Sequence, residues 1–290
     1  MDINKLLAEN NTELLQGGTV GEVTRINDYV LKTQRKWERH GDPDCWRREY
    51  DMYVSGFDKT IPHIKIPQCY HVSMDGDTTY ILMEYIDGRT GVDEIGIDEL
   101  AFTANKIGQF HREYRDNKLT WLRDFPAVIS SYDLWYGKIK DRLHESDFDF
   151  LNDYTERKDE IFRSFTALPR TLCHGDVHHD NIILRDNNVY LIDWDSAGFG
   201  YIGEDAVDML CEAFVYSDRD VALMGEFRDR IIAAYCDGAG IKLDAVMVRN
   251  IFMMSWGFRI VASFFYYHDN PNMRQRCADI LRFMSDSPQF

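Results

Sequence analysis

The chain contains 290 residues, of which 44% are apolar and 28% charged, as in globular proteins that bury a sizeable hydrophobic core. Its formal net charge of −16 argues against nucleic acid as the natural partner, because binding to phosphates requires many lysine and arginine side chains. An acidic cleft would attract a cationic small molecule, and the same charge fits a role in solubility equally well.

Signals for secretion, membrane insertion and disulfide formation are missing from the sequence. Residues 1–5 lack a basic region followed by an apolar run. The apolar segment 251–258 is cut off by Arg259 and is too short to span a bilayer. Six scattered cysteines without a C-x-x-C pair indicate reduced thiols. We therefore expect a cytoplasmic protein with no membrane partner.

The first part of the chain predicts a small sheet with one helix. The predicted elements are a short helix or strand within 3–15, strands at 15–26 and 29–32, a loop at 33–44, a helix at 45–57, and strands at 64–72 and 79–84. Gly17, Gly18 and Gly21 match neither a Walker sequence nor the G-x-G-x-x-G pattern, so alone they indicate a plain hairpin. These elements would form an N-terminal lobe.

A join between two lobes is expected at residues 82–88. An apolar strand leaves the sheet there and reaches Asp87 and Gly88, a turn that would let a second lobe move. A simple strand followed by a turn would have the same sequence. Beyond the join, an amphipathic pattern predicts a helix at 97–114, followed by helices at 132–143 and 148–165. The acidic residues between 141 and 160 fit a solvated face or one wall of a substrate cleft.

Residues 171–195 carry the strongest chemical signal. They predict a strand, a polar loop, a second strand, a turn at 186–188 and a third strand that ends in carboxylates. The loop presents Asp176 and Asn181, and the last strand delivers Asp193 to the same end of a small sheet. These oxygen donors suit a hard cation such as Mg²⁺, which prefers phosphate as a further ligand.

The remaining C-terminal part is expected to be mainly helical. The predicted elements are a glycine-rich loop at 196–203, a helix that begins at 204, helices at 221–235 and 245–267, and a last helix at 273–284. Acidic residues in the first turn of the helix after 204 are stabilised by the helix dipole.

His174-Gly-Asp-x-His-x-x-Asn181, followed by Ile192-Asp-Trp-Asp195, resembles the catalytic signature of the aminoglycoside phosphotransferase and choline kinase-like families. These families are small-molecule relatives of the protein kinases. The resemblance implies an α+β, two-lobed protein kinase-like fold. A small antiparallel-sheet lobe would cover residues 1–84 and a mainly helical lobe residues 85–290, with a hinge at about 84–88.

The same resemblance assigns roles to the site residues. Asp176 would be the catalytic base, and Asn181 and Asp193 the metal ligands. A flap made of Gly17, Gly18 and Gly21 would cover the phosphates of ATP. Lys32 on a strand would reach the α- and β-phosphates, and Glu49 on a helix would fix the lysine. Adenine would be surrounded by the gatekeeper side chain of Met83, the backbone carbonyl of Glu84 and the backbone amide of Ile86.

These assignments predict an enzyme that transfers the γ-phosphoryl group of ATP, with Mg²⁺, to a hydroxyl of a small molecule. Aminoglycosides suit the acidity of the chain, whereas choline, homoserine or methylthioribose would use the same catalytic residues. Asp205 and Asp208 are predicted to brace the catalytic loop, and His111 is expected to be structural. His174 and His178 are expected to bond the loop backbone and to fix the direction of Asp176.

Three other interpretations stay open at this point. The cluster of His174, His178 and His179 would suit a transition metal, and Gly175-Asp-Val-His178 resembles the first metal motif of calcineurin-like phosphoesterases, although their later motifs are missing. A catalytically silent nucleotide-binding module is disfavoured by the suitable side chains at all five kinase-type positions. A protein kinase is disfavoured because no Ala-Pro-Glu segment follows Asp195.

Overall fold

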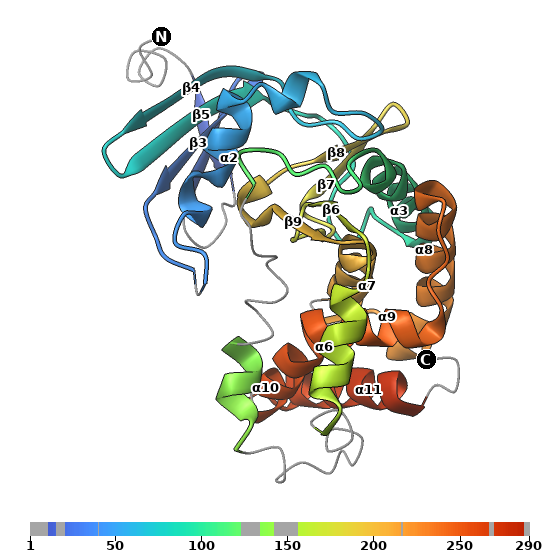
Figure 1. Ribbon diagram of the computed structural model, residues 1–290. Helices are drawn as coiled ribbons and strands as arrows, with labels where there is room; N and C mark the ends of the chain where they lie inside the picture. The colour runs from blue at the N-terminus through green and yellow to red at the C-terminus, as the bar shows by residue number, and fades with distance from the viewer. Residues whose placement is uncertain are drawn as a thin grey trace.

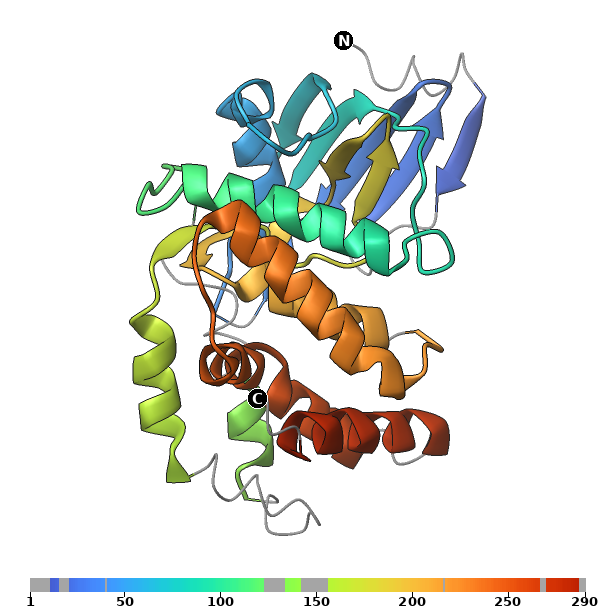
Figure 2. The ribbon, with the colours of Figure 1, turned by 90° about the vertical axis from the view of Figure 1, so that its right-hand side faces the viewer.

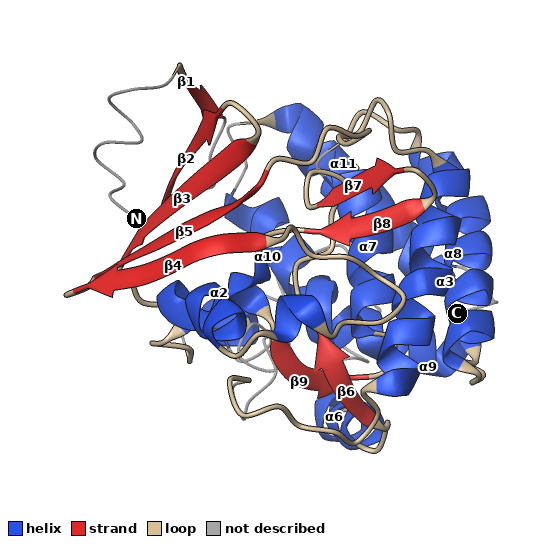
Figure 3. Ribbon diagram, turned by 90° about the horizontal axis from the view of Figure 1, so that it is seen from above, coloured by secondary structure: helices blue, strands red, loops and turns tan. Residues whose placement is uncertain are grey.

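A computed structural model describes residues 11–15, 21–39, 41–122, 134–141, 156–215, 217–266 and 270–286. The described chain forms two lobes, an upper one built around a sheet and a lower one built mainly of helices (Figure 1). Seen from above, the five-stranded sheet lies on one side of the molecule and most of the helices lie on the other (Figure 3). The predicted α+β, two-lobed architecture is confirmed.

The upper lobe is an antiparallel sheet with one helix. Its strands are β1 (Thr12–Leu15), β2 (Gly21–Ile26), β3 (Tyr29–Arg35), β4 (Cys69–Asp75) and β5 (Thr78–Glu84), in the order β1-β2-β3-β5-β4. Helix α2 (Cys45–Val54) packs against this sheet. Gly56 ends the helical segment with φ 73°, a left-handed conformation that glycine accepts without a steric penalty.

Two predicted boundaries in this lobe are wrong. Residues 33–35, expected in a loop, continue β3, because their backbones pair with β5 from Tyr80 to Thr78. The strand expected from residue 64 begins at Cys69. Lys65 instead forms a bridge with Tyr190 of the lower lobe, so this segment supports a different hairpin.

Two short strand pairs lie where the catalytic motif was expected. β6 (Arg170–Cys173) pairs with β9 (Gly198–Tyr201), and β7 (Ile182–Arg185) pairs with β8 (Asn188–Leu191). The second pair is the predicted hairpin. β9 falls within the segment predicted as a glycine-rich loop, so that prediction is wrong. A Cβ on Gly200 would lie 2.8 Å from the sulfur of Cys173, so glycine permits the close pairing of β9 with β6.

Helices form the rest of the lower lobe. They are α3 (Ile97–Glu113), α6 (Lys158–Thr166), α7 (Glu204–Val215), α8 (Met224–Ala239), α9 (Ala245–Phe252), α10 (Phe258–Tyr266) and α11 (Pro271–Asp286), together with short 3₁₀ helices at Phe57–Lys59, Trp194–Ser196 and Val221–Leu223. The helix predicted at 245–267 is interrupted by a π-helical turn, Met253–Gly257. Residues 123–133 and 142–155, which include parts of two predicted helices, lie outside the described residues.

Helices α3 and α8 lie side by side in the lower lobe (Figure 2). Glycine allows their backbones to touch. A Cβ on Gly238 would lie 2.1 Å from the carbonyl oxygen of Asn105, and one on Gly108 would lie 2.3 Å from that of Tyr235. The same contact brings His111 of α3 within 2.8 Å of the hydroxyl of Tyr235 of α8.

One helical stretch, Ala245–Ser263, is long and apolar enough to cross a membrane by length and composition. However, 67% of its apolar window is buried inside the structure. Ile251, Trp256 and Val261 belong to the hydrophobic core, so the apolar character of the stretch is accounted for by packing within the lobe.

Candidate active site

The predicted catalytic loop follows β6 and is held by the first two turns of α7. Asp205 accepts hydrogen bonds from the backbone amides of His174 (2.8 Å) and Gly175 (2.9 Å). Asp208 accepts one from the amide of Val177 (2.7 Å). The three amides would otherwise lack partners in a buried loop, so these bonds fix the loop backbone. The bracing role predicted for both aspartates is confirmed.

Asp205 is itself held by a buried polar network. His111 Nε2 lies 3.0 Å from Asp205 Oδ2, and His111 Nδ1 lies 2.8 Å from the hydroxyl of Tyr235. The Asp205 carboxylate can only accept, so His111 carries a proton on Nε2, and the Tyr235 hydroxyl, which accepts from the amide of Gly203, is placed to donate to Nδ1. Burial opposes ionisation of Asp205, but the hydrogen bonds from His111 and Gly175 and the neighbouring imidazoles together outweigh burial and lower the pKa of the carboxyl.

This network includes the one set of three potential metal ligands that converge in the described part of the chain, His111, Cys173 and Asp205. His111 and Asp205 already bond one another, and all three residues are buried in the core. The set therefore acts as a structural support for the loop.

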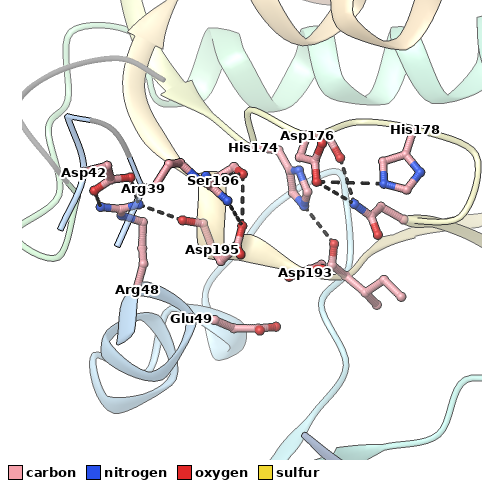
Figure 4. Close-up of polar contacts among 12 residues, drawn as sticks. Arg39, Asp42, Arg48, Glu49, His174, Asp176, His178, Asp193, Asp195 and Ser196 are labelled. Atoms are coloured by element: carbon pink, nitrogen blue, oxygen red, sulfur yellow. Dashed lines mark hydrogen bonds and ion pairs between the residues drawn. The ribbon is translucent and has the colours of Figure 1, made fainter. Parts of the chain in front are cut away.

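Asp176 lies within the braced loop, with His178 close to it (Figure 4). Asn181 donates from its amide nitrogen to the Asp176 carbonyl (2.9 Å) and, at 3.4 Å, to Oδ2 of its carboxylate. His178 Nε2 lies 3.8 Å from the same oxygen. Burial raises the pKa of Asp176, and the neighbouring carboxylate of Asp193 adds to this effect against the opposing charge of His178.

Asp193 joins this loop to the upper lobe through a lysine. Lys32 on β3 places its ammonium 2.7 Å from Asp193 Oδ1 and 2.5 Å from Glu49 Oε2 on α2. Burial of the ammonium opposes its charge, but Asp193 and Glu49 outweigh burial and raise the pKa of Lys32, so the lysine stays protonated. Asp193 has φ 66°, a conformation that is uncommon for a residue other than glycine and aims its carboxylate at Lys32.

The β7–β8 hairpin is held on both edges. Leu191 donates from its amide to the carbonyl of Lys65 (2.9 Å), while Leu184 and Arg89 exchange backbone hydrogen bonds of 2.9 and 3.0 Å. A Cβ on Gly88 would lie 2.8 Å from the Leu184 carbonyl oxygen. The glycine of the predicted turn is therefore needed for this close approach, because it lets the chain after β5 reach β7.

The residues predicted around adenine lie at and after the end of β5. Met83 is buried, and its sulfur lies 3.5 Å from the hydroxyl of Tyr53 on α2. The side chain of Glu84 lies 3.7 Å from Arg185. The amide of Ile86 donates to no group among the described residues, which leaves it available to a ligand. Of the predicted glycine flap, Gly21 begins β2, whereas Gly17 and Gly18 lie outside the described residues.

Two further acidic side chains, Asp208 and Glu212 on α7, lie near Asp176. Asp208 Oδ1 accepts a hydrogen bond from the indole of Trp256 (2.8 Å), which projects from the π-helical turn. Burial, reinforced by the charge of Asp176, raises the pKa of Asp208 to about 7. Burial and the charge of Asp208 raise the pKa of Glu212, one helical turn later, to about 9. Two carboxyl groups thus lie on one face of α7 within electrostatic reach of Asp176.

Comparison with known families supplies the identification. A model of the phosphotransferase enzyme family matches residues 22–246 of this chain. The chain belongs to the phosphotransferase enzyme family. The family recognised from the catalytic motif and the enzyme class predicted from it, a phosphotransferase with a small-molecule alcohol as acceptor, are confirmed. Among curated proteins, no sequence matches the chain at a significant level.

Solved structures of kinases share the fold of this phosphotransferase. A microcompartment-associated aminopropanol kinase has a TM-score of 0.63 and 14% identity over 97% of this chain and 94% of its own. A choline/ethanolamine kinase family protein from Mesorhizobium loti has a TM-score of 0.62 and 15% identity over 97% and 90%. An amicoumacin kinase in complex with AMP-PNP and Ca²⁺ has a TM-score of 0.58 and 16% identity over 96% and 89%. At these identities the likeness shows the fold alone.

The family match contradicts the phosphoesterase interpretation, and the histidines give a physical reason. His174 Nε2 bonds the carbonyl of Ile192 (2.9 Å), and the ring packs against Trp194. His179 Nε2 faces Asp180 at 3.5 Å. Among the described residues, His174, His178 and His179 do not bring ligand atoms together as a metal site requires.

Sequence reasoning did not single out Glu212, which lies within electrostatic reach of Asp176 in the structure. Its spacing of four residues from Asp208 on a predicted helix places both carboxyls on one helix face. That spacing was the available signal. The network of Arg39, Asp42 and Arg48 beside Asp195 was also missed, because its members come together only in the folded chain.

Proposed function

We propose that this phosphotransferase transfers the γ-phosphoryl group of ATP, with Mg²⁺, to a hydroxyl of a cationic small molecule. One observation carries the proposal: Lys32, Glu49 and Asp193 meet at 2.5–2.7 Å directly beside the Asp176–Asn181 pair. A buried ammonium between two carboxylates, next to a partly exposed carboxylate, is the set of charges that phosphoryl transfer from a nucleotide requires.

In this proposal Asp176 is the catalytic base. Its carboxylate would accept a hydrogen bond from the substrate hydroxyl and then the proton of that hydroxyl. Burial and the Asp193 carboxylate raise its pKa, which makes Asp176 a better proton acceptor than an ordinary aspartate. The hydrogen bonds from Asn181 to the Asp176 backbone and side chain would keep the carboxylate in one direction.

The nucleotide would lie between β2, β3 and the chain after β5. Lys32 would contact the non-transferred phosphates, and Glu49 would hold it in place. The free amide of Ile86 and the carbonyl of Glu84 would bond adenine next to Met83, while Gly17, Gly18 and Gly21 would cover the phosphates. Residues 1–84 would then act as the nucleotide-binding lobe and residues 85–290 as the catalytic lobe, joined at 84–88.

Asn181 and Asp193 fit a magnesium site. Asn181 uses its amide nitrogen for Asp176, so its amide oxygen is the atom left for a cation. Asp193 contacts Lys32 through Oδ1 and makes no hydrogen bond through its second oxygen within the described residues. Oxygen donors of this kind are what Mg²⁺ prefers. When bound, Mg²⁺ would neutralise charge on the phosphates.

The acceptor would carry an amine as well as a hydroxyl. Asp208 and Glu212 supply carboxyl groups within electrostatic reach of Asp176. An ammonium group of a substrate would favour the ionised form of both acids. Aminoglycosides meet this description, and so do metabolites of the choline type; homoserine and methylthioribose are the remaining metabolite acceptors. A cytoplasmic location is part of the same proposal.

An ATP-consumption screen tests the proposal. The purified protein is incubated with ATP and Mg²⁺ and with aminoglycosides, amino alcohols or neutral sugars, and an Asp176→Ala variant serves as the control. We expect consumption with an amine-bearing group, phosphorylated product by mass spectrometry, and loss of both in Asp176→Ala. Consumption only with neutral sugars would contradict the cationic acceptor, and near-normal transfer by Asp176→Ala would falsify the base assignment.

A further inference from the structure

A tight corner precedes α2 in the upper lobe. Arg39 and Asp42 form a bridge, with the Asp42 amide 2.9 Å from the Arg39 carbonyl, and Gly41 between them has φ 69°. Arg48, on the first turn of α2, returns to this corner. Its guanidinium bonds both carboxylate oxygens of Asp42, at 2.7 and 2.5 Å. Such a two-pronged contact fixes the direction of the arginine as well as its position.

Side chains of this corner bond to the lower lobe, at the short 3₁₀ helix Trp194–Ser196 that follows Asp193. Arg48 donates to the backbone carbonyl of Asp195 at 2.7 Å. Arg39 donates to the carboxylate of Asp195 at 3.1 Å and to the hydroxyl of Ser196 at 2.7 Å. Figure 4 shows the two arginines converging on Asp195 and Ser196.

The Arg48–Asp42 pair is buried, and the network as a whole is electrically balanced. Arg48 and Asp42 are each 3% exposed, and the two arginines together match the charges of Asp42 and Asp195. Removing ions from water costs several kcal/mol per ion, so a buried pair of this kind adds little net stability over apolar side chains. The fixed geometry of the network is therefore better explained by a role in holding α2 in place against Asp195 of the lower lobe.

The network holds both sides of the Lys32 site. Glu49, which bonds Lys32, is the next residue after Arg48 on α2. Asp193, which bonds Lys32 from the other side, lies two residues before Asp195. Moving α2 away from the lower lobe would break the Arg48–Asp195 contact and separate Glu49 from Asp193 at the same time.

We propose that Arg48 and Arg39 are positioning residues, which couple the placement of Glu49 on α2 to that of Asp193 in the lower lobe. The inference rests on the proposed ATP- and Mg²⁺-dependent transfer and names residues beyond the nucleotide, metal and base positions. Neither arginine touches the reacting groups. Each arginine acts through the backbone or side chain of Asp195. Loss of either arginine therefore displaces Asp193 and weakens the binding of the metal-bound nucleotide.

The test compares Arg48→Met with Arg47→Met, using the best acceptor from the ATP screen. Arg47 is the preceding residue on α2, but it is 37% exposed, and among the described residues its ion pair is with Asp51 on the same helix. We measure kcat, KM for ATP, the Mg²⁺ concentration for half-maximal rate, and thermal unfolding. Arg48→Met should lower kcat/KM for ATP at least about tenfold and raise the Mg²⁺ requirement about threefold or more, because metal and nucleotide lose their alignment.

Arg47→Met should leave each kinetic constant within about twofold, because exposed ion pairs contribute little. Arg48→Lys should recover only part of the loss, because an ammonium lacks the planar fork that bonds Asp42 and Asp195 together. If Arg48→Met is folded and keeps the wild-type kcat/KM and Mg²⁺ requirement, the positioning role is wrong.

Should Arg48→Met fail to fold, Arg39→Met carries the test. Arg39 is 30% exposed, and its loss removes the contacts to the Asp195 carboxylate and Ser196 together with a cation–π contact to Trp37 on the same segment. A folded Arg39→Met with an unchanged Mg²⁺ requirement would overturn the coupling. A raised requirement supports it. Failure of the proposed function is distinguishable, because the wild-type protein itself would then show no Mg²⁺-dependent binding of ATP.

Discussion

The brace between α7 and the catalytic loop gives the sharpest mutational prediction. Asp205→Asn changes one oxygen of the side chain into an amide and keeps its size. Asp205 Oδ2 accepts from the His174 amide and from His111, while Oδ1 accepts from the Gly175 amide. An asparagine has one acceptor oxygen, so it can replace either Oδ1 or Oδ2 as an acceptor but not both. Its NH₂ group then faces the N–H donor that the other carboxylate oxygen had bonded.

The size of the effect follows from these contacts. Losing one hydrogen bond to a charged group costs about 1.5–3 kcal/mol, and leaving its donor buried without a partner adds about 1 kcal/mol. A total of about 2.5–4 kcal/mol, expressed in the placement of Asp176, lowers kcat/KM roughly 70- to 900-fold. Part of the same energy will appear as a lower free energy of unfolding.

The assay combines steady-state kinetics with urea unfolding of the same preparations. Asp279→Asn is the matched control, because Asp279 is an exposed aspartate paired with Arg282 on the last helix. The control should stay within about 0.5 kcal/mol in unfolding free energy and about twofold in kcat/KM. If Asp205→Asn behaved like this control, Asp205 would not hold the loop and the bracing argument would be refuted.

Three further changes test other parts of the structure. Gly238→Ala should lower the free energy of unfolding by about 1–3 kcal/mol in urea titrations, because its Cβ would meet a backbone carbonyl at 2.1 Å. Gly225→Ala on the same helix should be neutral or stabilising, because its Cβ would lie 3.6 Å from a phenyl ring; equal losses would contradict the packing argument. Lys32→Met should reduce ATP affinity at least about tenfold in a binding titration, because Glu49 is left without its partner; an unchanged affinity would remove Lys32 from the nucleotide site. Burial and the charge of Asp208 raise the pKa of Glu212 from 4.5 to about 9, so the folded state holds a proton that the unfolded chain has lost. The free energy of unfolding should therefore fall as pH rises between these values, and Glu212→Gln should become more stable relative to the wild type from about pH 6 to about pH 8.5 in urea titrations. A constant difference would refute the raised pKa.

The sequence was most informative where the chemistry is local. Asp176 and Asn181 lie five residues apart in one loop, and a hairpin of fixed length brings Asp193 back to them. Turn residues and alternating apolar positions are enough to predict such an arrangement. Lys32 and Glu49 lie in separate elements 17 residues apart, so their pairing depended on the family resemblance rather than on any local pattern.

Tertiary contacts decided what the sequence left open. Gly198–Tyr201 is rich in glycine and was expected to form a loop, yet β6 offers it a strand partner and a small side chain is required at Gly200. Arg48 and Asp195 are 147 residues apart, and neither carries a local signal of the other. The π-helical turn at Met253–Gly257 has the same apolar composition as the helices on both sides, so periodicity did not reveal it.

The most direct test of the central claim is the Mg²⁺ dependence of ATP binding by Asp193→Ala and Asp176→Ala, measured by calorimetric titration with and without the metal. If Asp193 holds metal-bound nucleotide and Asp176 acts on the acceptor, Asp193→Ala loses the gain in affinity that Mg²⁺ gives the wild type. Asp176→Ala keeps most of that gain. A wild-type response to Mg²⁺ in Asp193→Ala would contradict the site.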